Sequence, residues 1–125
     1  MDKQQITEHH AAGDVEWVGT RVWIALGGAV TQFANAGKRL SGITHYKGNI
    51  NRDDVSCIAT SLDAVAAAEI ELMPDGYSRE LYASNNVFVW GSRCRERTFD
   101  GPSEALNRAS ALLWAVADHK ERQDG

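Results

Sequence analysis

The residues best suited to metal binding or acid-base chemistry lie far apart along the chain. His9 and His10 stand between Glu8 and Asp14, and imidazole and carboxylate groups are common metal ligands. Adjacent histidine side chains point in different directions, however, so we expect this segment to be a solvated, frayed terminus. Four other potential ligands lack the short spacing of a metal site: His45, Cys57, Cys94 and His119. The sequence therefore predicts no bound metal.

Nucleophilic catalysis and phosphate binding are not indicated either. No serine stands in a Gly-x-Ser-x-Gly turn, and neither cysteine is visibly paired with a base. Gly27-Gly28 is not followed by the Gly-Lys-Ser/Thr of a phosphate-binding loop, and Gly37-Lys38 lacks the earlier glycine that such a loop needs. We therefore expect neither an enzyme nor a cofactor.

Two groups of basic residues could contact a partner. The first lies in a stretch rich in glycine and asparagine and consists, with Tyr46, of Lys38, Arg39, His45, Lys47 and Arg52. The second is expected on strand faces and consists of Arg79, Arg93, Arg95 and Arg97. Basic side chains interleaved with aromatic ones can bind phosphates and stack on bases. The alternative is that the first group lies in a solvated loop and that the strand arginines pair with nearby acids, namely Glu80, Glu96 and Asp100. The acidic net charge of the chain favours this alternative.

Four tryptophans are more than a core of this size needs, and tryptophan is favoured at protein interfaces. We expect at least two of Trp23, Trp90 and Trp114 to lie in the core. Trp17 lies off the apolar stripe of its segment and is the better candidate for a surface anchor.

Composition indicates a single globular domain over residues 1–125. The chain has 43% hydrophobic residues and two prolines, and its formal net charge of −4 gives no general attraction to nucleic acid or anionic lipid. Residues 1–10 lack the apolar core of a secretion signal, and the longest apolar run, 22–30, is too short to cross a membrane. With two cysteines outside any Cys-x-x-Cys pair, a reducing cytosol is the simplest compartment.

Capping residues and apolar spacing predict the helices. Residues 2–12 can form a short helix that Gly13 ends, and Asp14 caps an amphipathic helix over 15–26 that Gly27-Gly28 closes. Its buried face is expected to comprise Val15, Val18, Val22 and Leu26, with Trp23 beside them. We expect residues 29–36 to resume as helix and residues 37–54 to form a long loop insert.

The second half of the chain predicts two further helices and a sheet. Thr60 and Ser61 begin a helix over 61–72, which Pro74-Asp75-Gly76 stops. Its inward face is expected to comprise Leu62, Val65, Ala68 or Glu69, and Leu72.

Pro102 then opens a closing helix over 102–119. Its apolar stripe comprises Ala105, Leu106, Ala109, Leu112, Leu113 and Val116, and a solvated end begins near Asp118.

Alternating residues between the last two helices predict strands at 77–83, 87–90 and 93–99, joined by tight turns. Three consecutive strands make an antiparallel meander, and the amphipathic helices are the available covers for its faces. The predicted fold is therefore α+β: a short three-stranded antiparallel sheet packed with helices in one layered domain.

The order of these signals resembles a known family. The segment 14–26, then Thr60-Ser-Leu-Asp-Ala-Val-Ala66, the Pro-Asp-Gly-Tyr turn and the alanine-rich closing helix resemble small phage and prophage proteins with an alpha-beta-alpha (ABA) sandwich domain. The resemblance implies a phage origin and an accessory role, and it carries no catalytic residues. The insert at about 30–54 and the arginines at 93–97 depart from the pattern.

We therefore predict a phage-encoded, non-enzymatic protein in the cytoplasm of an infected bacterial host. It would bind and inhibit a host protein, and the specific target we predict is a CRISPR-type defence complex. The predicted contacts are Trp17, Arg39, His45, Tyr46, Lys47 and Arg52. The alternative is a nucleic-acid-binding module that uses Arg79, Arg93, Arg95 and Arg97.

Overall fold

The computed structural model describes residues 2–27, 29–32, 40–43, 58–81, 86–91 and 95–124. Within them lie the helices α1 (Lys3–Ala11), α2 (Val15–Ala25), α3 (Leu62–Leu72) and α4 (Glu104–Asp124). The strands are β1 (Ala29–Gln32), β2 (Leu40–Ile43), β3 (Ser78–Leu81), β4 (Val87–Trp90) and β5 (Arg95–Phe99). The predicted α+β class is confirmed, with helix predominating in the described residues.

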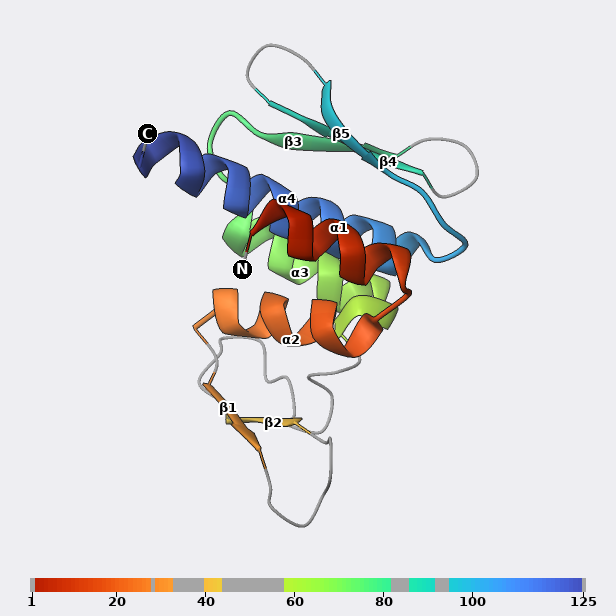
Figure 1. Ribbon diagram of the computed structural model, residues 1–125, viewed down its shortest axis with the longest axis vertical. Coiled ribbons are helices and arrows are strands. Elements are labelled where there is room, and N and C mark those ends of the chain that lie inside the picture. The colour runs from red at the N-terminus through yellow and green to blue at the C-terminus, as the bar shows by residue number, and fades with distance from the viewer. Residues whose placement is uncertain are drawn as a thin grey trace.

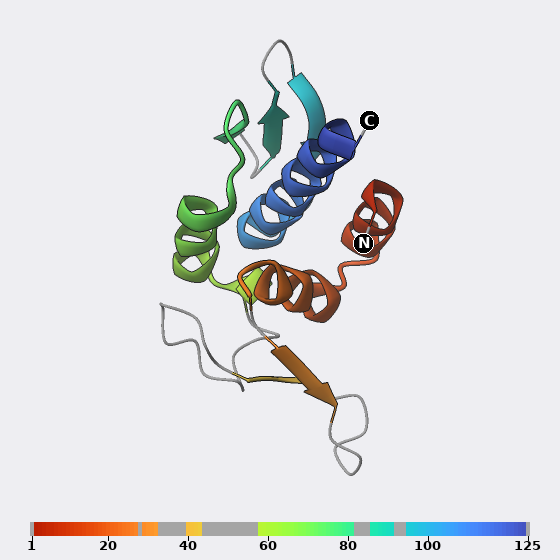
Figure 2. The same cartoon turned by 90° about the vertical axis from the view of Figure 1, so that its left-hand side faces the viewer.

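The closing helix α4 is the centre of the molecule. It packs against α1, α2, α3 and the strands β3, β4 and β5, as Figures 1 and 2 show. Every residue from Ala105 to Ala115 is buried, including Asn107, Arg108 and Ser110. The predicted apolar stripe is confirmed in that Ala105, Leu106, Ala109, Leu112 and Leu113 are buried and Val116 is half-buried. Burial extends beyond the stripe because helices pack on the sides of α4 that the sheet leaves open.

The strands β3, β4 and β5 pair antiparallel in the order β3-β4-β5. Val89 is opposite Arg79 on one side and Arg97 on the other. Because residues directly opposite each other share a face, and Val89 is fully buried, both arginines lie on the buried face of the sheet. All four helices lie on that side of the sheet in Figures 1 and 2.

The segment after α2 corrects two predictions. Residues 29–32 form the strand β1 rather than a helix, and β2 lies inside the stretch that was predicted to be a loop insert. The two strands pair antiparallel, with Ala29 opposite Ile43. Gly27, at φ 93°, turns the chain out of α2, and the β-branched pair Val30-Thr31 then favours an extended backbone. The rest of the predicted insert lies outside the described residues.

The predicted helix starts are largely confirmed. Asp14 caps α2 by accepting from the Trp17 amide at 3.1 Å, and Ser61, rather than Thr60, caps α3 by accepting from the Ala64 amide at 3.3 Å. The predicted start of the last helix was wrong: Ser103 accepts from the Leu106 amide at 3.1 Å, so Pro102 precedes the cap. The helix also continues past residue 119, to Asp124.

The hydrophobic core forms around α4. It includes Val18, Val22 and Trp23 of α2, Val65 and Ala68 of α3, and Val87, Val89 and Phe99 of the sheet. Two of the three predicted core tryptophans, Trp23 and Trp114, are buried at 0% and 8% exposure; the side chain of Trp90 lies outside the described part of the structure. Leu62, predicted to point inward, is 46% exposed.

Candidate partner-binding groove

The helix α3 carries an apolar side chain on its outer face. Val65 and Ala68 are buried at 0% and 1% exposure, and they pack on the core around α4. Ile70 follows Ala68 by two positions, so it projects from the opposite side of the helix, and its side chain is 85% exposed. Ala66 shares this outer face with Ile70, four residues away. Met73 follows the last residue of the helix and packs in part against the core.

A groove of about 470 Å³ lies beside Ile70. It runs between α3 and the start of β3, above α4, and is lined by Ala66, Glu69, Ile70, Met73, Tyr77, Ser78, Arg79 and Arg108. Figure 2 shows α3 and β3 on the same side of α4, which is the side opposite α1.

The charged residues of the groove bind one another. Arg79 donates from Nε to Glu69 Oε2 at 2.6 Å, and Arg108 donates from Nη2 to the other oxygen of Glu69. Arg108 also donates from Nη1 to Glu104 Oε2 at 3.3 Å. Glu69 and Arg108 are 10% and 8% exposed, so these contacts are shielded from water. The two arginines and two glutamates leave no net charge in this network.

The surroundings of Arg108 favour its charged form. Burial opposes the charge of Arg108, but its hydrogen bonds with Glu69 and Glu104 and their negative charges outweigh burial and raise the pKa of Arg108. Its Nε is buried without a hydrogen-bond partner among the described residues. Arg108 therefore stays charged and holds α3 to α4.

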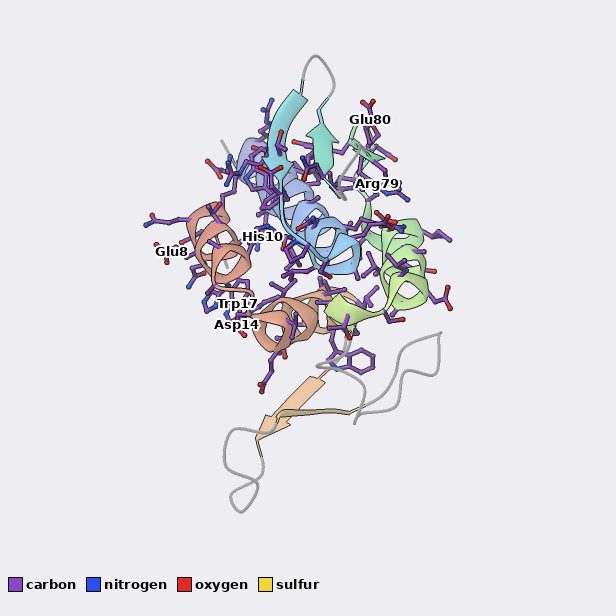
Figure 3. All side chains as sticks on the ribbon, turned by 90° about the vertical axis from the view of Figure 1, so that its right-hand side faces the viewer. Glu8, His10, Asp14, Trp17, Arg79 and Glu80 are labelled. Atoms are coloured by element: carbon purple, nitrogen blue, oxygen red, sulfur yellow. The ribbon has the colours of Figure 1, made fainter. Side chains whose placement is uncertain are left out.

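The surroundings of the groove are acidic. From Ser61 to Leu81 the chain has five acidic residues and one basic residue, Arg79, which the network already holds. Four of these acids are exposed: Asp63, Glu71, Asp75 and Glu80. Asp63 shares the outer face of α3 with Ala66 and Ile70, and Figure 3 shows Arg79 and Glu80 above α3.

The predicted site residues fall into three groups. Arg39, His45, Tyr46, Lys47, Arg52 and Arg93 lie outside the described residues, and of Arg95 only the backbone is described. Trp17 is half-buried: its ring stacks on His9 with centroids 4.0 Å apart, and the Arg21 guanidinium lies 5.3 Å from it. Arg79 and Arg97 make internal contacts.

Arg97 links the sheet to α1. It donates from Nη2 to Thr7 Oγ1 at 3.5 Å, and its guanidinium lies 5.1 Å from the Phe99 ring. The register shifts between Val89 and Trp90, so that Arg97 is opposite Val89 and Arg95 is opposite Trp90. The shift interrupts the regular alternation from which the sequence predicted a single arginine face.

The N-terminal histidines are not in a frayed terminus, and that prediction was wrong. A capping box of Asp2 and Gln5 starts α1. His9 Nδ1 lies 2.9 Å from Asp14 Oδ2. His10 lies 2.9 Å from Ser110 Oγ through Nδ1 and 2.8 Å from the Asp100 carbonyl through Nε2.

A serine beside an oriented histidine is the arrangement of an activated nucleophile. Ser110 is fully buried, however, so a substrate cannot reach its hydroxyl. The contact therefore ties α1 to α4 and to the turn before α4.

Asp118 forms a second polar tie, where the sequence predicted a solvated end. Its side chain is 4% exposed and accepts from Lys3 Nζ at 2.7 Å, Tyr77 Oη at 2.5 Å and Arg122 Nε at 2.9 Å. Burial favours the neutral acid, but the bonds from Lys3 and Tyr77 and the charges of Lys3 and Arg122 outweigh it and lower the pKa of Asp118. The cluster joins α1, α4 and the chain entering β3.

Sequence reasoning did not single out Ile70, Glu69, Arg108 or Asp118 as site residues. For Ile70 a signal was present, because it falls outside the inward stripe of its helix and stands between two glutamates. For the other three no signal was present, because each is paired with a residue distant in the chain.

The described residues contain no group of three or more histidine, cysteine or acidic side chains that could hold a metal ion. Of the helices that the structure describes, none has the length and apolar character needed to span a bilayer. Comparison with protein-family models, with characterised proteins and with solved structures finds no match to this chain, so the resemblance to the ABA sandwich proteins stays a prediction.

Proposed function

We propose that this protein is a non-enzymatic accessory protein that binds a partner protein at the groove between α3 and β3 and blocks the surface it covers. The observation that carries the proposal is Ile70, which is 85% exposed at the edge of that groove. Transfer of an aliphatic side chain of this size from water into an interface is worth about 1.5–3 kcal/mol. An exposed apolar side chain beside a concave surface can anchor an interface when the partner covers it fully.

The pairing of charges within the groove supports binding rather than catalysis. A general acid or base needs a titratable group that can exchange its proton with a substrate. Glu69 and Arg108 instead bind each other and their neighbours Arg79 and Glu104. This network fixes the shape of the groove and supplies no reactive group.

The partner class comes from the resemblance to phage accessory proteins. On that basis the partner is a host protein, with a CRISPR-type defence complex as the concrete version, and the site of action is the cytoplasm of an infected bacterium. Trp17 and the predicted contacts of the insert, Arg39, His45, Tyr46, Lys47 and Arg52, form a second proposed contact region.

Affinity purification from the natural host, followed by mass spectrometry, tests this proposal. We expect the tagged protein to recover a partner that Ile70→Ser loses. Gln4→Ser is the control, because Gln4 is exposed but lies on α1, which belongs to neither proposed contact region. The control should recover the partner fully.

A third variant, in which a Gly/Ser linker replaces residues 43–51, separates the two contact regions. Loss of the partner with this variant alone, and full recovery with Ile70→Ser, would overturn the groove as the binding site. Recovery of the same proteins by all variants would overturn the proposal as a whole.

A further inference from the structure

Resting on the proposed function, we infer that the groove between α3 and β3 binds a basic segment of the partner protein: an aliphatic or aromatic anchor flanked by lysine or arginine. The anchor covers Ile70, and the flanking cations meet the exposed carboxylates around the groove. The groove thus selects its partner by charge as well as by shape.

The apolar part of the surface requires an apolar anchor. Ala66 and Ile70 lie on the outer face of α3, and together with Met73, which follows the helix, they line the groove. Ile70 is the most exposed of the large apolar side chains in the described residues, at 85% against 41–46% for the others. An anchor seated on it removes apolar surface from water on both sides of the interface.

The charged part of the surface requires positive flanks. Asp63 and Glu71 on α3 and Asp75 just after it are exposed, and Arg79, the one basic residue between Ser61 and Leu81, already binds Glu69. The exposed charge of residues 61–81, which form most of the groove, is therefore negative. Lysine or arginine beside the anchor would be attracted, whereas a flank of acids would be repelled.

The same negative charge disfavours other occupants. Two copies of the chain that met through this face would bring like charges together, and such contacts are unfavourable. Phosphate groups of nucleic acid or anionic lipid carry the wrong sign. A basic protein segment is the occupant that fits both the apolar and the charged parts.

Three synthetic peptides of equal length test the inference with the full chain. The first has a central leucine flanked by two lysines on each side, the second replaces the lysines by glutamates, and the third replaces the leucine by serine. We expect the first peptide to shift the backbone NMR signals of Ala66, Ile70, Met73 and Ser78. The other two should bind at least about tenfold more weakly.

Protein variants identify the residues that provide the selectivity. Ile70→Ser should weaken binding of the first peptide about tenfold or more. Because the Ile70 side chain is exposed, the variant should fold normally. The double variant Glu71→Gln with Asp75→Asn should weaken binding of the first peptide about five- to tenfold and make that binding less dependent on salt. The control double variant, Glu8→Gln with Asp100→Asn, removes the same amount of charge far from α3 and should leave the affinity for the first peptide unchanged. Figure 3 shows Glu8 on the opposite side of the molecule from α3.

The outcomes separate this inference from the proposed function. Suppose that Ile70→Ser abolishes binding of the host partner while the Glu71 and Asp75 double variant binds it with unchanged affinity. In that case the proposed function stands, and the inference of a basic segment is wrong. If neither the partner nor any peptide depends on Ile70, both fail. Preference for the glutamate peptide, or an Ile70-dependent dimer in sedimentation, would also overturn the inference.

Discussion

At the scale of single residues, Asp118 shows how a buried carboxylate contributes to stability. The lowered pKa of Asp118 means that the folded state prefers its charged form more than the unfolded state does. Its contribution is therefore fully present above the ordinary carboxyl pKa, near 3.8, and is lost as the pH falls through the folded pKa. The pKa of Lys3 shifts in the opposite direction, because its pairing with Asp118 raises it above 10.5. The contribution of Lys3 to folding stability is therefore lost only in strong alkali.

Asp118→Asn should lower the free energy of unfolding at pH 7 by about 3 kcal/mol, because it removes one partner of a buried ion pair. Urea titrations should show that the difference from wild type shrinks as the pH falls from about 4 through the lowered pKa of Asp118, where the folded wild-type carboxylate also becomes protonated. Glu121→Gln is the control, since Glu121 lies 3.4 Å from the same lysine but is 66% exposed, and its loss should cost about 0.5 kcal/mol or less. An Asp118→Asn deficit that is equally large at pH 2 would contradict this account.

The two neighbouring histidines should adopt opposite neutral tautomers. The Asp100 carbonyl can only accept, so His10 carries its proton on Nε2 and accepts from Ser110 through Nδ1. The Asp14 carboxylate requires the reverse for His9, with the proton on Nδ1. Long-range proton–nitrogen NMR of the neutral rings distinguishes the two forms.

Ser110→Ala should leave His9 unchanged and cost about 1–2 kcal/mol in unfolding free energy, because it leaves the His10 acceptor unpaired. The same tautomer for both rings would show that one of these contacts is wrong.

Residue-scale contacts were the least predictable part of the candidate site. The cap of Asp14 on the Trp17 amide could be predicted because its partner lies three residues away. The ties from Lys3 to Asp118 and from His10 to Ser110 join residues about a hundred positions apart. Periodicity within a segment gives no information about such a pair, which depends on how the helices pack.

At the scale of elements, α1 is attached to the rest of the molecule mainly by polar and ring contacts. Ile6 is its single fully buried side chain, and the polar contacts of Lys3 and His10 fix its two ends. The helix is short and mostly polar, so its own propensity cannot keep it folded. Tertiary contacts therefore decide whether α1 forms.

Ile6→Ala should destabilise the protein by about 3 kcal/mol, the usual cost of truncating a buried aliphatic side chain. We expect hydrogen exchange to accelerate first in α1, while the amides of α4 keep their protection. Gln4→Ala, at an exposed position of the same helix, should leave exchange unchanged. Uniform acceleration throughout α4 would show instead that α1 unfolds only together with the core.

Element positions were predictable where caps and apolar spacing agreed, as in α2 and α3. Element positions were not predictable where pairing with a distant part of the chain decides the conformation. β1 follows a helix directly, and although Val30 and Thr31 favour an extended backbone, its strand conformation comes with pairing to β2, which the local sequence does not reveal. The buried polar residues of α4 likewise depend on partners in other elements, such as Glu69 for Arg108.

At the scale of the whole molecule, the net charge and the charges of the described residues oppose binding of nucleic acid. The net charge is −4, and the exposed acids of residues 61–81 surround the groove. Arg79 and Arg97, the strand arginines whose side chains the structure describes, lie on the buried face of the sheet and bind Glu69 and Thr7. Phosphate contacts would have to displace these internal bonds.

We therefore expect no retardation of single-stranded or duplex DNA or RNA in gel-shift assays at about 50 mM salt, where phosphate contacts are strongest. The protein should be in large excess, and a basic DNA-binding domain should serve as the positive control. Arg97→Gln should leave this result unchanged, because its side chain contacts α1 rather than a partner. Retardation that weakens steeply with salt, and that Arg97→Gln reduces, would require Arg97 to leave Thr7 and would favour the nucleic-acid alternative over a protein partner.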